Sequence, residues 1–393
     1  MDNFWYIDLM RLLFVADGRS PIAQNWIRYF AERGTEIHLA STFACTPEFR
    51  LDGLEIIPVA FSGAAKAPRA TAGRTSSLIL GVRSGIRHWL GPLTIPRAAR
   101  RLRRLIRELK PDLVHAFRIP YEGMLAADAY GESPLLVSVW GNDFTLHAPS
   151  NGLMAHYTSW TMQVADALHA DCQRDIRLGK KWGFDTSRPT LVIPGNGGIR
   201  ANVFHPPERP VEQPIVINPR GFRTYVRNDV FFRAIPQVLA KQPDARFLCV
   251  GMAGELQALK WIRELAIEGA VELLPALPHE QMADVFRRGQ VMASISTHDG
   301  TPNTLLEGMA CGCVPVAADL DSIREWIRPG KNGLLINPRD SASVAEGILE
   351  GLQNKSLRLG AAGENQKIIA ERAEYGRCMA AAEQFYRRVI ASQ

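Results

Sequence analysis

The sequence predicts an α/β fold of two doubly wound domains in tandem. The chain has 393 residues, which is more than one ordinary domain needs and suits two. Short apolar segments alternate with helix-like segments, a pattern typical of parallel sheets covered on both faces. The alternation runs twice, and residues 205–214, with four prolines in ten positions, separate the two runs.

The first run begins with an apolar strand at 11–16, a loop at 17–21 and a helix at 22–34, which Gly34 ends. A basic helix precedes Pro111. Further strands are expected at 36–40, 54–61, 112–116, 135–139, 167–170 and 190–193.

The second run repeats this arrangement. Strands are expected at 215–217, 246–250, 271–274, 291–295, 314–317 and 334–336. Helices are expected at 228–241, 256–268, 279–288, 322–327, 341–353 and 355–391.

These runs predict three parts of the chain. Residues 1–210 form a first Rossmann-like domain, residues 211–372 form a second, and residues 373–393 form a terminal helix that packs back on the first. Ligands of such sheets bind beyond the carboxyl ends of the strands, so we expect both sheets to face a central cleft.

Composition indicates a globular protein. The chain is 46% apolar and 22% charged, and no window of about eighteen residues is apolar and uncharged enough for a membrane span. The first eleven residues lack the features of a signal peptide. The six cysteines lack metal-site or redox spacing, which favours buried thiols in a reducing compartment. We therefore expect a cytoplasmic protein.

Positive charge gathers at residues 83–110, which hold nine Arg or Lys and one acid, Glu108. Leu102, Leu105, Ile106 and Leu109 form an apolar stripe there at helical spacing. The segment is either a basic amphipathic surface for the anionic inner face of the cell membrane or an ordinary helix with a solvated basic face. No aromatic platform, zinc module or RNA-binding signature accompanies the charge, so a nucleic-acid partner is not expected.

Several common motifs are absent from the sequence. Neither run has G-x-G-x-x-G after its first strand, which disfavours a nicotinamide dehydrogenase. The chain also lacks a Walker motif, H-E-x-x-H, G-x-S-x-G and a D-x-D metal site. We expect no metal and no cofactor.

The most informative stretch runs from Asp299 to Val316. Residues 300–303 suggest a tight turn and residues 304–310 a buried helix. The amides at the start of this helix can hold a phosphate. Glu307 and Asp299 can each accept hydrogen bonds from a polyol, and phosphate between two polyols describes a nucleotide sugar. Alternatively, Asp299 merely starts a loop and Glu307 is a half-buried helix residue.

This string resembles the E-x7-E region of family 4 glycosyltransferases, in a D-G-T-P-N variant with Asp299 for the first Glu. Segments 12–21, 114–116, 137–143, 193–197 and 332–340 resemble other landmarks of that family, in order along nearly the whole chain from residue 11. The resemblance implies a GT-B fold and retaining, metal-independent hexosyl transfer from a nucleotide diphosphate-sugar.

The resemblance also implies roles for residues of the second domain. Arg220 and Arg227 would stabilise the leaving diphosphate, with Arg223 as a competing candidate, and Asp299 would position the donor sugar. Glu307 would hold the ribose hydroxyls, and residues 274–277 would line the base. The other donor-binding candidates are Gly251, Gly300, Thr301, Pro302, Asn303, Thr304 and Leu305.

On the acceptor and sugar side, Trp140 stands where many members of the family have a His. The usual Gly-Gly of the first loop is also absent, with Ser20-Pro21 in that region. His115, at a strand end, is expected to be a packed structural residue. The candidates on this side are Gly18, Arg19, Trp140, Asn142 and Asp143.

The resulting hypothesis is sugar transfer from a UDP- or GDP-sugar to a glycan or lipid-linked acceptor, in polysaccharide or glycolipid biosynthesis. Two alternatives stay open: a sugar-nucleotide epimerase on the same fold, and an inactive transferase-like scaffold. The sequence names neither the base, the sugar, the acceptor nor a general base.

Overall fold

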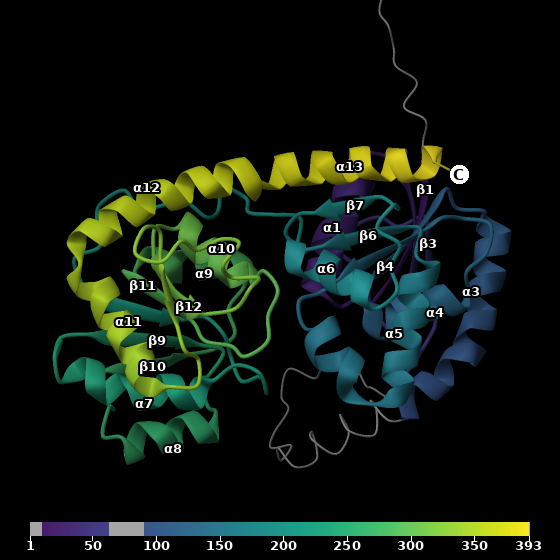
Figure 1. Ribbon diagram of the computed structural model, residues 1–393. Helices are drawn as coiled ribbons and strands as arrows, with labels where there is room; N and C mark the ends of the chain where they lie inside the picture. The colour runs from purple at the N-terminus through teal and green to yellow at the C-terminus, as the bar shows by residue number, and fades with distance from the viewer. Residues whose placement is uncertain (1–9, 63–89, 393) are drawn as a thin grey trace, which may run out of the picture. The chain divides into compact units, whose positions relative to one another are not determined.

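Two compact units make up the chain. Contacts divide it into Met1–Gly197 together with Met379–Gln393, and Gly198–Cys378. The computed structural model describes residues 10–62 and 90–392 (Figure 1). The first unit is therefore built from two stretches of chain and the second from one. The domain boundaries expected at 210 and 372 remain predictions about which parts fold independently.

The first unit contains a parallel sheet of seven strands in the order β3-β2-β1-β4-β5-β6-β7. The order reverses between β1 and β4, which is where sheets of this kind bind ligands. The strands are β1 (Arg11–Ala16), β2 (Glu36–Ser41), β3 (Gly53–Ile56), β4 (Leu113–Phe117), β5 (Leu135–Val139), β6 (Ala167–Ala170) and β7 (Thr190–Val192).

Helices cover both faces of this sheet. Side chains of α3, α4 and α5 share one buried cluster with the strands. On the other face, α1 and α13 contribute Trp26, Phe30 and Tyr386 to an aromatic layer over Phe14 and His115. The helices are α1 (Pro21–Ala31), α3 (Ile95–Leu109), α4 (Met124–Asp128), α5 (Gly152–Val164), α6 (Gln173–Lys181) and α13 (Tyr375–Ala391).

The second unit contains a parallel sheet of six strands in the order β10-β9-β8-β11-β12-β13. Here the order reverses between β8 and β11. The strands are β8 (Ile215–Asn218), β9 (Arg246–Val250), β10 (Val271–Leu274), β11 (Val291–Ser294), β12 (Val314–Ala318) and β13 (Leu334–Ile336).

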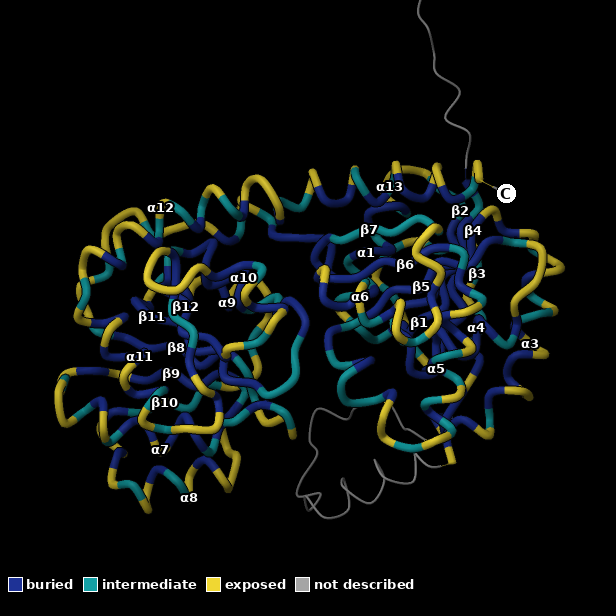
Figure 2. Tube along the Cα trace, viewed as in Figure 1, coloured by how far each residue is buried: buried dark blue, intermediate teal, exposed yellow. Residues whose placement is uncertain are grey.

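Two buried clusters flank this second sheet, one with side chains of α7, α8 and α11 and one with those of α9, α10 and α12. Figure 2 shows the strands of both units as the buried interior. The fold is thus α/β with two doubly wound sheets. The helices are α7 (Asn228–Leu239), α8 (Leu256–Glu264), α9 (His279–Arg287), α10 (Asn303–Ala310), α11 (Ser341–Gln353) and α12 (Lys355–Arg372).

The expected helix at 322–327 was wrong, because this segment forms turns. The side chain of Asn332 replaces the helical partners: its Oδ1 accepts from Arg328 N at 2.6 Å and its Nδ2 donates to Trp326 O at 2.9 Å. The single helix expected at 355–391 is two helices, α12 and α13. Between them, the amide of Ile199 donates to the Ala373 carbonyl, and the Ile199 carbonyl accepts from the amide of Tyr375. This strand-like bridge interrupts the helix.

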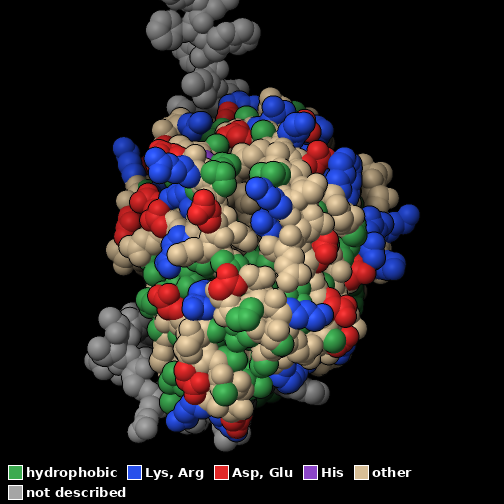
Figure 3. All heavy atoms as spheres, turned by 90° about the vertical axis from the view of Figure 1, so that its left-hand side faces the viewer, with side chains coloured by type: hydrophobic (Ala, Val, Ile, Leu, Met, Phe, Trp, Pro, Cys, Tyr) green, Lys and Arg blue, Asp and Glu red, His purple; other side chains and the backbone are tan. Residues whose placement is uncertain are grey.

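The surface is mixed in charge where Figure 3 shows it. Among the described side chains on that face, Lys and Arg are interspersed with Asp and Glu, without a continuous basic stripe. No helix within residues 10–62 and 90–392 is long and apolar enough to cross a membrane. All six cysteines are free thiols, and five of them are buried.

Candidate functional site

The second unit gathers its predicted residues at the carboxyl ends of β8 and β11. Arg220 follows β8 and forms an ion pair with Asp299, which follows β11; the two side chains are 11% and 13% exposed. Ser296 Oγ donates to Asp299 Oδ2 at 2.9 Å, and Ser322 Oγ donates to its main-chain O at 2.8 Å. The carboxylate is therefore fixed both at its side chain and at its backbone.

Tyr225 completes the surroundings of Arg220, whose Nη2 lies 3.4 Å from the Tyr225 hydroxyl. Burial opposes the positive charge of Arg220, but the attraction of Asp299 outweighs it and leaves the pKa of the guanidinium raised. The result is a permanent cation, held rigidly at the ligand-binding edge of the sheet.

Helix α10 starts directly after this loop. Its N-cap position, Pro302, has no side chain that can bond to the first amides. The buried Thr304 Oγ1 also makes no hydrogen bond within the described residues. Thr301 is anchored by Trp326, whose Nε1 donates to its Oγ1 at 2.9 Å. The helix start thus offers donors beside Arg220 and Asp299, as an anion site requires.

Glu307 lies one turn into α10 and is 5% exposed. Its Oε1 is 3.1 Å from Nε2 of His279, the first residue of α9. A buried carboxylate with one defined partner can still accept hydrogen bonds from a ligand's hydroxyls. His279 was missed by the sequence analysis, because no motif connects it to Glu307.

Gly251 has φ +72° and follows β9. A Cβ added to Gly221, in the loop after β8, would lie 3.0 Å from the Gly251 carbonyl. The two glycines therefore let the loops after β8 and β9 approach closely. This contact places Gly251 beside the loop that carries Arg220.

Arg227 is already engaged by a carboxylate. Its Nε and Nη2 each donate to Asp229 at 2.8 Å, and the two arginines around Asp229 lower the pKa of that carboxyl. Arg223 is exposed, with its Nη1 3.5 Å from the Tyr225 hydroxyl. The role of Arg227 in binding a diphosphate, with Arg223 as the competing candidate, stays a prediction.

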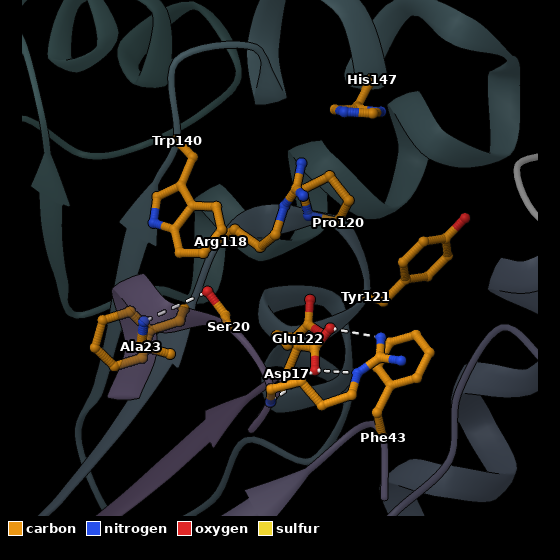
Figure 4. A pocket seen from close by; sticks show the side chains of 12 residues that line it. Asp17, Ser20, Ala23, Phe43, Arg118, Pro120, Tyr121, Glu122, Trp140 and His147 are labelled. Carbon is orange, nitrogen blue, oxygen red and sulfur yellow. Dashed lines mark hydrogen bonds and ion pairs between the residues drawn. The ribbon is translucent and has the colours of Figure 1, made fainter. Parts of the chain in front are cut away.

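The first unit has a pocket of about 330 Å³ where β1, β2, β4 and β5 end (Figure 4). This edge is the switch point of its sheet, the expected position for a ligand. The lining residues are Asp17, Arg19, Ser20, Ala23, Phe43, Phe117, Arg118, Pro120, Tyr121, Glu122, Trp140 and His147.

Arg118 and Tyr121, in the turn after β4, adopt backbone conformations that side chains rarely take. Arg118 has φ 74° and ψ 157°, and Tyr121 has φ 70° and ψ −53°. Arg118 Nη2 donates to Asp143 Oδ1 at 2.7 Å, while Asp143 Oδ2 accepts from the amides of Ile119 and Trp140. Strain of this kind persists where surrounding contacts enforce it, often at functional sites.

Only two of the five residues expected on the acceptor side line the pocket, Arg19 and Trp140. Gly18 packs against Cys45, and its amide donates to Ser41 Oγ at 3.0 Å. The Asn142 carbonyl caps the turn that follows it, and the Asp143 side chain is fully buried and positions Arg118.

Sequence reasoning missed Arg118, Tyr121 and Glu122. They directly follow β4, so the rule that ligands bind at strand ends would have found them.

Beneath the sheet edge, polar side chains form a chain of hydrogen bonds. Trp26 Nε1 donates to Tyr386 OH at 2.8 Å, and that hydroxyl bonds His115 Nδ1 at 2.5 Å. Ser138 Oγ bonds His115 Nε2 and His169 Nδ1, each at 2.8 Å. Burial lowers the pKa of His169 to about 4 and that of His115 well below its usual value. His115 is thus a structural residue.

One group in the described part of the chain has metal-like spacing: Asp171, Cys172 and Asp175. Arg174 already supplies its cation, because Nη2 lies 2.7 Å from Asp175 Oδ1. Burial still raises the pKa of Asp175 to about 6. The ion pair between Arg174 and Asp175 lies at the start of α6 and already provides the positive charge next to this group.

Two family models match the chain, one in each unit. "Glycosyl transferase 4-like" matches residues 11–171, and "Glycosyl transferases group 1" matches residues 219–354. The chain belongs to the group 1 glycosyltransferases. The second match spans Arg220, Asp299 and Glu307, and the first spans the residues of the pocket.

Curated relatives are similar over part of their length. A D-inositol 3-phosphate glycosyltransferase of Thermobispora bispora is 25% identical over 213 residues, which are 49% of each chain. Its counterpart from Rhodococcus erythropolis is 31% identical over 139 residues, 33% of this chain and 31% of the relative. The chain spans about half the length, or less, of these curated relatives.

Solved structures with the same fold align over nearly the whole chain. Sucrose-phosphate synthase from Thermosynechococcus elongatus has a TM-score of 0.75 at 14% identity, over 98% of this chain and 100% of that one. Anabaena HepE in complex with UDP-glucose has a TM-score of 0.70 at 16% identity, over 98% and 100%. The GT-B fold expected from the sequence is confirmed.

Proposed function

We propose that this chain transfers a sugar from a nucleoside diphosphate-sugar, with retention of configuration, to a hydroxyl of a glycan or lipid-linked acceptor. The observation that carries the proposal is the grouping of Arg220, Asp299, the start of α10 and Glu307 at one sheet edge. A cation and free helix amides suit a diphosphate, and the two carboxylates suit hydroxyls on either side of it.

The roles follow from charge. As the bond between sugar and diphosphate breaks, negative charge grows on the leaving phosphate. Arg220 and the amides of Asn303 and Thr304, at the start of α10, are oriented in advance to stabilise that charge, so no solvent has to reorganise during the step. Asp299 lies beside Arg220 and binds sugar hydroxyls, while Glu307 binds ribose hydroxyls. These protein donors take the part that a divalent metal plays in other transferases.

The donor base is proposed to be uracil or guanine. HepE, which shares the fold, has been solved with UDP and with UDP-glucose, which supports a uridine nucleotide. A thermal-shift panel of UDP, GDP, ADP, CMP and dTDP tests this choice. Nucleotide at a hundred times its Kd should add about 2.7 kcal/mol to the free energy of unfolding.

The same panel on Glu307→Ala tests the location. One nucleotide should stabilise the wild type and lose its effect in Glu307→Ala, while Glu346→Ala, an exposed acid on α11, keeps it. If no nucleotide raises the melting temperature of the wild type, the transferase proposal fails and the inactive scaffold gains support. Release of free nucleoside diphosphate from the donor then separates transfer from epimerisation, which keeps the nucleotide sugar intact.

Helix α3 suggests how an acceptor held in a membrane would be approached. Its apolar stripe, including Leu102 and Ile106, is buried in the unit, so only the basic face remains exposed. Binding to an anionic bilayer would therefore rest on charge alone and weaken with salt. Arg83 and Arg87 of the expected basic segment lie outside the described residues. Flotation with anionic vesicles at low salt is expected to recover the protein; failure to bind there overturns this part.

A further inference from the structure

His279 adds a side chain to the carboxyl edge of the second sheet. Four neighbouring strands, β10-β9-β8-β11, end at this edge. Asp299 follows β11, Arg220 follows β8 and Gly251 follows β9. His279 follows β10, because the loop 275–278 leads directly from that strand to the first residue of α9. Each of these strands therefore contributes a residue to the edge where ligands of such sheets bind.

Glu307 reaches the same edge from α10, with a carboxylate almost withdrawn from water. The residue is 5% exposed. A carboxylate in that position stays charged and oriented only if donors replace the water it has lost. Within residues 10–62 and 90–392, the side chain of Glu307 has one such donor, His279 Nε2, which lies 3.1 Å from Oε1. No Lys or Arg of these residues forms an ion pair with it.

This contact leaves most of the carboxylate to a ligand. The two oxygens of a carboxylate offer about four acceptor positions, and the bond from His279 takes one of them. Oε2 of Glu307 has no hydrogen-bond partner in the described part of the chain. Two vicinal hydroxyls can therefore donate one bond to each oxygen, provided that the carboxylate does not rotate.

The ring of His279 is itself held by packing. Its centre lies 4.6 Å from that of Phe204, with an angle of 61° between the two planes, and Phe204 is 2% exposed. Such an edge contact with a buried ring limits rotation of the imidazole. Half of the His279 side chain, 51%, stays exposed, so a ligand can approach the contact from solvent.

We propose that His279 is a positioning residue for donor binding, which orients Glu307 so that its carboxylate recognises the hydroxyls of the ribose. The proposal rests on the proposed transferase function and deepens it, because it names the side chain that lets the site distinguish ribonucleotides from deoxyribonucleotides. A site rejects a ligand that lacks a hydroxyl when the acceptor for that hydroxyl is already in place. Without His279 the carboxylate is free to turn, and ordering it opposes ribose binding.

Calorimetric titration of the full chain with matched nucleotide pairs tests this role. The pairs are UDP with 2′-deoxy-UDP and GDP with 2′-deoxy-GDP, since the proposed base is uracil or guanine. The deoxy member lacks one ribose hydroxyl and keeps the base and the diphosphate. In the pair that matches the donor base, we expect the wild type to bind the ribonucleotide at least about tenfold more tightly, because a hydrogen bond to a charged acceptor contributes about a decade or more.

Two substitutions separate the hydrogen bond of His279 from its packing. His279→Phe keeps a ring for the contact with Phe204 but has no donor, so the Kd ratio should fall toward one, mainly because the ribonucleotide binds more weakly. His279→Gln restores an N–H donor and should keep a ratio close to that of the wild type. His279→Ala removes the donor as well and replaces the Phe variant if that variant does not fold.

A neighbouring acid on the same helix provides the control. Glu280→Gln changes the charge of an exposed residue next to His279 and should leave both Kd values of the pair unchanged. A purely structural role for His279 predicts a different result, because His279→Phe would then weaken both members of the pair equally and leave their ratio as it is.

The outcomes separate this inference from the function it rests on. A wild-type ratio near one, a ratio unmoved by His279→Phe, or an equal loss in His279→Phe and His279→Gln overturns the role of His279. If the ribonucleotide binds the wild type in any of these cases, only this inference is lost. If no nucleotide of either pair binds the wild type, the transferase proposal falls and this inference falls with it.

Discussion

Asp299 and Arg220 neutralise one another before any ligand is present. The ion pair keeps both groups at the ligand-binding edge while limiting how strongly Arg220 attracts phosphate. This pairing is consistent with a division of roles in which the carboxylate binds the donor sugar and the guanidinium binds the leaving diphosphate. The pair would then separate these two tasks within one contact.

Replacing Asp299 should therefore affect binding and transfer in opposite directions. In Asp299→Asn the positive charge of Arg220 is no longer neutralised by a carboxylate. We therefore expect nucleoside diphosphate to bind severalfold more tightly, as coupling between close charges implies. Transfer should fall because the sugar loses an ionic acceptor. Calorimetry measures the first effect and release of nucleoside diphosphate the second. Asp319→Asn, which breaks an exposed ion pair with Arg324, is the control and should change neither.

The backbones of Gly221 and Gly251 approach each other closely, and this contact can be tested with single substitutions. Gly221→Ala would place a Cβ 3.0 Å from the Gly251 carbonyl, and backbone cannot yield as a flexible side chain does. We expect a loss of about 1–3 kcal/mol in the free energy of unfolding. Gly269→Ala, with open space around the new Cβ, should stay within about 1 kcal/mol. Urea unfolding of both variants decides; equal effects would contradict the steric reason.

Single residues also show how far sequence could reach. Asp299, Arg220 and Glu307 could be predicted as site residues because they share a motif or follow a strand. Glu122 and Arg118 were not predicted, because only motifs were followed and the strand-end rule was not applied to the loop after β4. His279 reaches Glu307 from another helix, a contact that only the tertiary fold creates.

At the scale of elements, most strands could be placed from apolar runs alone. β1, β5 and β6 have the predicted bounds, because a strand buried on both faces leaves a short, nearly continuous apolar segment. The bounds of β9, β10 and β13 also match the prediction. The segment 322–327 failed for the opposite reason. Its helical pattern was outweighed by a side chain ten residues from its start, Asn332, which binds the main chain.

Helix α13 depends on one hydroxyl for its polar contacts with the sheet. Tyr386 OH accepts from Trp26 Nε1 and is hydrogen-bonded to His115 Nδ1, so Tyr386→Phe leaves a buried N–H and a buried imidazole nitrogen without this partner. We expect a loss of about 1–3 kcal/mol in the free energy of unfolding. Tyr157→Phe is the control, since its hydroxyl makes no hydrogen bond among the described residues. Thermal unfolding of both variants measures the difference; equal melting temperatures would contradict the role of the hydroxyl.

At the scale of the molecule, buried histidines link folding to pH. The pKa of His169 is lowered to about 4 in the folded protein, against an ordinary value near 6.5, so the unfolded chain binds its proton first. Stability should therefore fall between about pH 6.5 and pH 4, by about 3 kcal/mol for His169. Asp175, with its pKa raised to about 6, acts in the opposite sense.

A difference experiment isolates the histidine. Urea unfolding from pH 7 to pH 4 should show a steeper loss of stability in the wild type than in His169→Gln, which cannot bind the proton. His156→Gln, which removes an exposed imidazole from α5, serves as the control for loss of a histidine. Parallel slopes for the wild type and His169→Gln would contradict the assignment.

The return of α13 to the first unit has a consequence for how the protein is made. Trp26 and His115 leave the ribosome early, yet their partner Tyr386 is translated hundreds of residues later, after the whole second unit. While the second unit is synthesised, the nascent first unit therefore lacks α13, and the face that holds Trp26 and His115 stays exposed. A stop codon near residue 378 would leave both sheets encoded but that face open, a natural target for chaperones and proteases.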